Sequence, residues 1–428
     1  MKLLIKNGRV VDPANNLDEP RDILVENGKI NRIAKVINNG ADKTIDAAGK
    51  IVLPGLVDMH VHLRQPGRED KETIASGTKA ALKGGVTTLL AMANTSPAID
   101  SVENIRMLKD IIAETAVNNV LICAAITEAR SGKELTQIAK LRKESIVAIS
   151  DDGASVDSTE LMYKAMRKAR ENKIPVICHC EDKLLSGGGV MNLGSISTRL
   201  GLKGISPESE YKRVQRDISL AEKAKCRVHI CHVSCAETVE IIAKAKKKGV
   251  KVTCETAPHY FSLCEEALLE YDTNKKMNPP LRSRKDLEAI KEGLAKGVID
   301  AIASDHAPHT ISDKDIEFDR AEFGVIGLET ELAAAITYLV LPRVLSWAEL
   351  AKKMSWNPAR ILGIDKGTLT PGRDADLIIV DPEKSWLVKK EDFVSKSKNS
   401  AFIGVDLKGV VETTILDGKI AYKQEIKD

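Results

Sequence analysis

The segment Gly55–Gly67, GLVDMHVHLRQPG, places two histidines at the end of a short apolar run. Side chains in a strand alternate between its two faces, so His60 and His62 point the same way and their imidazoles can bind one ion. Eight histidines in the whole chain would give roughly 0.15 such pairs by chance. The pair alone is a weak sign of metal binding, and its meaning depends on the fold around it.

The composition is that of an ordinary globular protein, with 428 residues of which 43% are hydrophobic and 29% charged. The net charge of +3 is close to balance, which does not favour nucleic-acid or anionic-membrane partners. No apolar run approaches the ~20 residues of a membrane-spanning helix, and the N-terminus alternates like a strand. All eight cysteines lie between Cys123 and Cys264, which argues against the disulfide framework of a secreted protein. We expect a cytoplasmic protein with reduced cysteines.

Apolar, β-branched runs alternate with helix-like stretches through the middle of the chain. Eight of these runs end near polar residues, namely His62, Asn94, Thr127, Asp152, Glu181, Ser234, His259 and Asp305. Amphipathic spacing predicts helices between them, over residues 71–83, 102–117, 158–172, 206–224, 236–248 and 284–296. Eight strand-and-helix units are the count of a closed barrel. We therefore predict an α/β fold in which residues 53–365 form a TIM-like (β/α)8 barrel.

The two ends of the chain differ from the middle. Residues 1–52 and 366–428 contain short strand-like runs joined by Asn-Gly and Gly turns. The segments LVENGKINRI and TILDGKIAYK, at 24–33 and 414–423, even share a strand, x-Gly-Lys-Ile, strand pattern. Two separate terminal hairpins would bury little surface. We predict one small β-sandwich domain assembled from both termini.

A barrel of this kind also predicts where the reactive side chains gather, because its active site lies at the C-terminal ends of the strands. The residues at those ends are His60, His62, Asp151, Asp152, His179, His232 and Asp305. A single histidine would more often be a buried polar residue, but five coincidences at strand ends favour a divalent-metal site, with zinc preferred by these donors. If two ions bind, an aspartate of the fourth strand is placed to bridge them. Cys231, next to His232, should face away from the site.

The same stretches resemble the amidohydrolase superfamily and, more closely, the bacterial dihydroorotases of the long, type I group. The matching stretches are HVHLRQPG (60–67), MANTSP (92–97), SDDG (150–153), CHCED (178–182), CHVS (231–234), MNPPLR (277–282) and SDHAPH (304–309). They cover the barrel in order, and NPARILGI with GTLTPGRDADLIIVD matches the superfamily's return to the terminal β-domain. Taken together these motifs are highly specific.

The resemblance implies one or two zinc ions per subunit. Its metal ligands would be His60, His62 and Asp305 for one ion, and His179 and His232 for the other. Many relatives bridge the ions with a carbamylated lysine, but this chain has SDDG in its place, which implies Asp152 as the bridge. The implied reaction is the reversible cyclisation of N-carbamoyl-aspartate to dihydroorotate in pyrimidine synthesis. Zinc-bound hydroxide would attack the ring amide, and Asp305 would transfer the proton.

Substrate recognition requires a cation for the substrate carboxylate. Arg64 lies two positions after His62, on the same face if the strand continues, and its guanidinium matches a carboxylate with two parallel hydrogen bonds. The resemblance adds Asn94, Asn278 and His309 to the pocket, together with the backbone at Phe323 and Gly324, where relatives often have Pro-Gly. The charged segment 309–323 resembles a mobile lid. His229 and His259 are assigned to structure.

Two alternatives stay open. A hydantoinase or allantoinase would share the ligands but usually keeps the bridging lysine. An inactive dihydroorotase-like partner of aspartate transcarbamoylase would typically have lost metal-binding histidines, and none is missing here. The resemblance is compatible with a homodimer and with a complex with aspartate transcarbamoylase.

Overall fold

The computed structural model describes residues 2–38 and 40–425. Eight parallel strands form the central barrel sheet: β6 (Leu56–Val61), β7 (Val86–Ala91), β8 (Asn119–Ala124), β9 (Ala148–Ile149), β10 (Val176–Cys178), β13 (Val228–Ile230), β14 (Val252–Thr256) and β15 (Ala301–Ile302). The sheet curls back on itself, because the His62 N–H donates to the His306 carbonyl at 2.9 Å just beyond the last strand. The predicted barrel is confirmed, with a strand at each of the eight predicted places.

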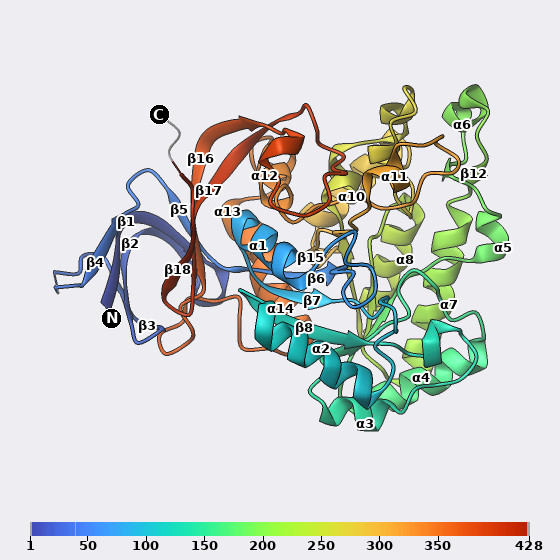
Figure 1. The fold of residues 1–428 in the computed structure, drawn as a ribbon, viewed down its shortest axis with the longest axis horizontal. Helices are drawn as coiled ribbons and strands as arrows, with labels where there is room; N and C mark the ends of the chain where they lie inside the picture. The colour runs from blue at the N-terminus through green and yellow to red at the C-terminus, as the bar shows by residue number, and fades with distance from the viewer. Residues whose placement is uncertain (1, 39, 426–428) are drawn as a thin grey trace.

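Helices surround this sheet (Figure 1). The longer ones are α1 (Ile74–Gly84), α2 (Val102–Thr115), α4 (Thr159–Glu171), α7 (Glu208–Ala224), α8 (Ala236–Lys247) and α10 (Arg284–Ala295). All six match predicted helices within a few residues. The largest shift is at α1, where the Thr73 side chain accepts from the Ser76 N–H and caps the helix three residues after the predicted start.

Shorter elements complete the barrel domain. They are the helices α3 (Ile138–Lys143), α5 (Lys183–Ser186), α6 (Ser195–Leu200), α9 (Pro258–Ser262), α11 (Ile311–Lys314), α12 (Glu331–Ala335), α13 (Trp347–Ala351) and α14 (Asn357–Leu362), and the strand pair β11 (Met191–Asn192) and β12 (Gly204–Ile205). Within the described part of the chain, no helix combines the length and the apolar character needed to cross a membrane.

A second sheet is built from both ends of the chain, the blue and red strands of Figure 1. It contains β1 (Lys2–Asp12), β2 (Leu17–Glu26), β3 (Lys29–Ala34), β4 (Lys43–Asp46), β5 (Ile51–Pro54), β16 (Leu377–Leu387), β17 (Asp406–Leu416) and β18 (Lys419–Lys423). The termini meet where β5 pairs antiparallel with β16, Val52 opposite Ile379. Both side chains belong to a buried core of this sheet's own. The predicted terminal β-domain is confirmed, and its limits at residues 52 and 366 stay a prediction.

The loop between β16 and β17 returns to the barrel. Ser397 Oγ donates to the Lys71 carbonyl at 2.7 Å, and the His309 N–H donates to Asn399 Oδ1 at 3.1 Å. Inside the barrel, apolar side chains such as Met59, Leu90 and Ile177 fill the space below the strand ends. The terminal segment thus packs against the loops that follow the first and last barrel strands.

Candidate metal centre and substrate pocket

The two histidines of β6 and its end face one point, as the alternation of the strand predicts. His60 Nε2 lies 3.4 Å from Asp152 Oδ1 and 3.6 Å from Asp305 Oδ1. His62 Nε2 lies 3.5 Å from Asp152 Oδ2 and 3.4 Å from Asp305 Oδ1. Both imidazoles are buried. Two imidazole nitrogens and two carboxylates thus converge from strands 1, 4 and 8 of the barrel.

The other ring nitrogen of each histidine, Nδ1, has a hydrogen-bond partner of its own. His60 Nδ1 is 2.8 Å from Glu255 Oε1, and His62 Nδ1 is 2.8 Å from Asn94 Oδ1. Since a carboxylate or amide oxygen can only accept, each Nδ1 carries a hydrogen, and each Nε2 is the ring nitrogen that faces the centre. Asn94, predicted to contact substrate, is therefore placed behind a metal ligand. Glu255, which also binds His229 Nε2 at 3.1 Å, was not identified from sequence.

A second pair of histidines meets the same carboxylate. His179 Nδ1 and His232 Nε2 lie 3.5 and 3.7 Å from Asp152 Oδ1 and 2.8 Å from each other. Among the described residues, His60 Nε2 and Asp152 Oδ1 are buried without a hydrogen-bond partner. Buried polar atoms without partners cost free energy unless a cation satisfies them. These residues therefore fit a divalent metal, with Asp152 between the two groups of histidines.

Electrostatics agrees with this arrangement. Burial alone would raise the pKa of Asp152, but His60, His179 and His232 outweigh it and hold the pKa well below its usual range. Asp305 behaves in the same way, since burial is outweighed by His60 and His62. Both groups are carboxylates at neutral pH, which is the form that binds a metal ion.

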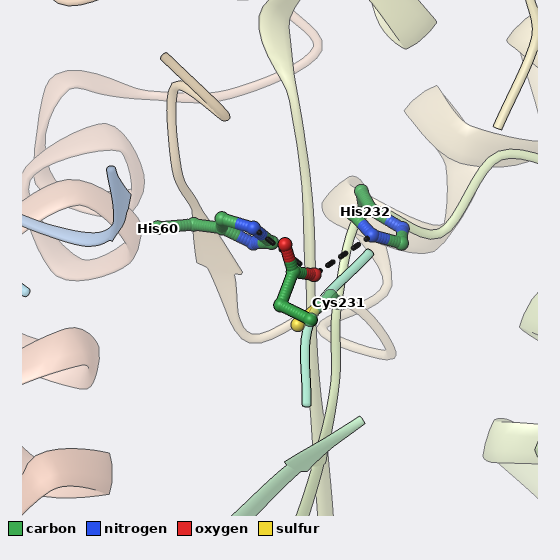
Figure 2. A group of neighbouring side chains, drawn as sticks. His60, Cys231 and His232 are labelled. Carbon is green, nitrogen blue, oxygen red and sulfur yellow. Dashed lines mark ion pairs between the residues drawn. The ribbon is translucent and has the colours of Figure 1, made fainter. Parts of the chain in front are cut away.

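The backbone turns sharply at the ends of the strands. His232 and Asp305 have φ of 33° and 49°, in the left-handed region that side chains other than glycine rarely adopt. Because β13 ends at Ile230, strand alternation does not extend to His232. The sulfur of Cys231 consequently lies in the same group as His60, Asp152 and His232, whose ligand atoms are within 4.8 Å of one another (Figure 2). The prediction that Cys231 faces away from the site is wrong for this reason.

The structure separates the two aspartates of the fourth strand. Asp151 Oδ1 accepts from the N–H groups of Ile126 and Thr127 at 2.8 and 3.1 Å. Its carboxylate is therefore used to tie β9 to the segment after β8. Asp152, the next residue, is left to face the histidines.

Arg64 and His309 lie next to the metal donors. Arg64, with φ of 61°, donates from Nε to the Pro308 carbonyl at 3.1 Å, and its Nη2 is 3.3 Å from His309 Nε2. Burial lowers the pKa of Arg64 to about 10, and the charges of Asp305 and Asp152 oppose that shift. The guanidinium is thus charged at neutral pH, and it lies close enough to Asp305 and Asp152 to interact electrostatically with both carboxylates.

The backbone at Phe323 and Gly324 closes the same pocket. His309 Nε2 lies 2.8 Å from the Phe323 carbonyl. Gly324 has φ of 126°, and a Cβ there would be 2.7 Å from Ala307 Cβ and 3.1 Å from His309 Nε2. Only glycine fits this position. The phenylalanine ring packs over Lys276, with Nζ 4.5 Å from its centroid.

Asn278 is held on the opposite side, near the second histidine pair. Its Nδ2 donates to Glu181 Oε2 at 3.1 Å, and the same oxygen is 3.4 Å from His179 Nε2. The sequence placed Glu181, within the CHCED motif, at the end of the fifth strand but gave it no role in the site. Glu181 links a predicted substrate residue to a predicted metal ligand.

The predicted lid is anchored. Lys314, on α11, donates from Nζ to the carbonyls of Glu322 and Gly324 at 2.7 and 3.0 Å. Mobility of this segment stays a prediction. His259, assigned to structure, packs edge-on against Tyr260 with ring centroids 4.2 Å apart, and burial lowers its pKa to about 4.

Comparisons with known proteins agree with this geometry. A family model described as "Dihydro-orotase-like" matches residues 49–238. The chain is 52% identical to a dihydroorotase of Elusimicrobium minutum over 98% of its own length and 97% of that protein. It is 50% identical to a dihydroorotase of Geobacter metallireducens over 99% of its own length and all of that protein. An L-hydantoinase (dihydropyrimidinase) from Arthrobacter aurescens superimposes with a TM-score of 0.90 at 27% identity, covering 100% of this chain and 97% of that one.

Barrel, terminal sheet and donor cluster together define a cyclic amide hydrolase of the amidohydrolase type. Within that class, the chain belongs to the dihydroorotase family.

Proposed function

We propose that this protein is a zinc-dependent dihydroorotase that interconverts N-carbamoyl-L-aspartate and L-dihydroorotate, the third step of pyrimidine biosynthesis. The observation that carries the proposal is the cationic pocket of Arg64 and His309 beside the cluster centred on Asp152. The first group suits a carboxylate and the second suits a metal ion at a ring amide. Dihydroorotate bears both a carboxylate and a cyclic amide.

The donors divide between two positions. His60, His62 and Asp305 form one group, and His179 and His232 form the other, with Asp152 between them. Zinc, when bound, polarises the amide carbonyl and lowers the pKa of water from ~16 to about 7. One or two zinc ions per subunit would occupy these positions.

Asp305 is the proposed proton carrier. Its carboxylate is kept ionised by His60 and His62, so it can take the proton of the attacking water. It then passes that proton to the departing ring nitrogen. In the direction of ring closure the same carboxylate removes the proton from the carbamoyl nitrogen.

The remaining predicted residues are assigned to the substrate. Arg64 and His309 bind its carboxylate, and the backbone at Phe323 and Gly324 borders the ring. Asn94 binds His62 through Oδ1, and Asn278 binds Glu181 through Nδ2. The other polar atom of each side-chain amide is proposed to bind the substrate ring. A homodimer, a complex with aspartate transcarbamoylase and a cytoplasmic location also stay proposals.

The decisive experiment follows dihydroorotate hydrolysis by absorbance in zinc-supplemented buffer, with hydantoin and allantoin in parallel and zinc measured on the same sample. We expect dihydroorotate to be turned over and the other two to be poor substrates. Preferential turnover of hydantoin or allantoin would support the alternative that the L-hydantoinase likeness suggests. Absence of bound metal would refute the ligand set.

A further inference from the structure

Lys71 is a buried cation at the edge of the substrate pocket. Its side chain lies just before α1 and the residue is 5% exposed, which is unusual because lysine is almost never buried without a partner. Its Nζ is 3.0 Å from His309 Nδ1 and 3.1 Å from Asp313 Oδ2. Ser397 Oγ fixes the Lys71 carbonyl from the terminal segment. The ammonium is thus held in place on one ring nitrogen of His309.

These contacts determine the state of the His309 ring. An ammonium group only donates, so Nδ1 must accept from Lys71. Nε2 has two neighbours, the Phe323 carbonyl at 2.8 Å, which only accepts, and Arg64 Nη2 at 3.3 Å, which only donates. The carbonyl is the nearer, so we assign the hydrogen to Nε2, and the approach of Arg64 is then a contact without a hydrogen bond. His309 is therefore the neutral Nε2–H tautomer, and it presents that N–H beside the Arg64 guanidinium, 3.3 Å away.

The charges around His309 leave room for one anion. Arg64 and Lys71 each bring a positive charge, and Asp313 brings one negative charge to Lys71. With His309 neutral, these three contacting side chains have a surplus of one positive charge, and Lys314 adds a further positive charge without a direct contact to the ring. A single substrate carboxylate would balance the surplus of the three, accepting from Arg64 and from His309 Nε2–H in exchange for the Phe323 carbonyl.

We propose that Lys71 is a positioning residue that makes this pocket selective for a carboxylate, by fixing the His309 tautomer and by supplying the charge surplus. The inference rests on the proposed dihydroorotase function and deepens it. Lys71 does not reach the metal donors, so its effect falls on binding of the carboxylate and not on the chemical step.

A purely structural role for Lys71 makes a different prediction. Lys314 is the matched case, because it is equally buried at 5% exposed and also ties the 310–324 segment with its ammonium group. Unlike Lys71, it donates to the backbone carbonyls of Lys276, Glu322 and Gly324, and no hydrogen bond joins it to the His309 ring. If burial of a cation under this loop were all that mattered, replacing either lysine would have the same effect.

The test compares Lys71→Met, Lys71→Arg and Lys314→Met in the full-length, metal-loaded protein. For Lys71→Met we expect the KM for dihydroorotate and the inhibition constant of orotate, which keeps the carboxylate, both to rise about tenfold or more. The kcat should stay within about threefold. Lys71→Arg, which keeps the charge, should recover part of the loss. Lys314→Met should lower stability and should raise KM clearly less than Lys71→Met does, because Lys314 holds the loop backbone and has no hydrogen bond to the His309 ring.

Nuclear magnetic resonance of the 15N-histidine-labelled protein gives a readout that does not depend on turnover. In the wild-type protein the His309 signal, assigned with a His309→Gln variant, should show hydrogen on Nε2, and in Lys71→Met the two tautomers should mix. Hydrogen on Nδ1 in the wild type would overturn the inference, and so would an unchanged KM in Lys71→Met or an equal KM rise in Lys314→Met. If Lys71→Met does not fold, the Lys71→Arg variant is used instead. A wild-type KM and a wild-type His309 signal in Lys71→Arg would together overturn the proposal. Wild-type protein without dihydroorotate turnover would remove the proposed function itself, and this inference with it.

Discussion

The site has a metal half around Asp152 and a substrate half around His309, and the two differ in how many of their polar atoms already have hydrogen-bond partners. Around Asp152, buried polar atoms lack partners among the described residues, and the cluster needs an ion to satisfy them. Around His309, both ring nitrogens have partners in the protein, and Arg64 already donates to a carbonyl. An ion at the metal half gives partners to atoms that have none and replaces one internal contact, that between His179 and His232, whereas in the substrate half a ligand must exchange existing hydrogen bonds for new ones. Loss of a single donor should therefore weaken ion binding strongly. Substrate affinity should instead depend on the difference between the hydrogen bonds that are broken and those that are formed around His309.

The largest effect is expected when the centre of the metal half is removed. Asp152→Ala takes away the carboxylate that faces four histidines, so bound metal should fall to near zero and turnover by ~10³-fold or more. Metal analysis and steady-state kinetics on one preparation measure both. Asp151→Asn, one residue earlier, should retain its metal because that carboxylate binds backbone N–H groups. Normal metal content in Asp152→Ala would contradict the bridging role.

A slightly smaller loss is expected from Asp305→Asn. The amide keeps the shape and one oxygen near His60 and His62 but accepts no proton, so kcat should fall ~10²–10⁴-fold while most of the metal remains. Turnover close to the wild-type rate would show that another group transfers the proton.

The substrate half should respond mainly in KM. Arg64→Met removes the guanidinium beside His309, and we expect the KM for dihydroorotate to rise by about 10- to 100-fold, with a smaller change in kcat. The exposed Arg68, which pairs with Asp70 on the surface, provides the matched control Arg68→Met. If both variants keep the wild-type KM, the carboxylate is held elsewhere.

The smallest effect is expected at Glu72, which contacts His306 in the barrel and Ser395 in the terminal segment. Burial would raise the pKa of Glu72, but hydrogen bonds with His306, Ser395 and Ser76 outweigh it and lower the pKa. A lowered folded-state pKa stabilises the protein above the unfolded value of about 4.5, and this contribution is lost as the pH falls through the folded value.

Chemical denaturation from pH 7 to pH 3 can check this. Wild-type protein should lose more free energy of unfolding on acidification than Glu72→Gln, whose amide does not titrate. Glu103→Gln, at an exposed glutamate of α2, controls for the change in net charge. Equal acid sensitivity of the wild type and Glu72→Gln would exclude the effect.

Much of the fold could be predicted from sequence because its signals are local. Apolar runs that end in polar residues placed all eight barrel strands, and the alternation of His60 and His62 placed their imidazoles on one face. The shared Gly-Lys-Ile pattern of the two ends indicated a common β-domain, and both segments lie in the terminal sheet, at β2–β3 and β17–β18.

The features of the site that escaped prediction depend on long-range contacts or on unusual backbone. Glu255 and Lys71 are ordinary charged residues in sequence, and only the folded chain brings them to His60 and His309. Arg64 and His232 have positive φ, so alternation cannot be extended to them, and the same cause reversed the expected direction of Cys231. The sequence identifies which side chains lie at the strand ends, but it does not reveal the backbone turns that set the directions of these side chains.

The terminal segment has a consequence for how the protein is made. Ser397 and Asn399 hydrogen-bond to Lys71 and His309, although they are encoded after the entire barrel. A ribosome that has completed residue 365 has released every predicted metal donor but not the groups that fix the substrate pocket. The nascent barrel should be able to bind its ion while synthesis continues, whereas the proposed substrate pocket is complete only when the segment with Ser397 and Asn399 has been made and has docked.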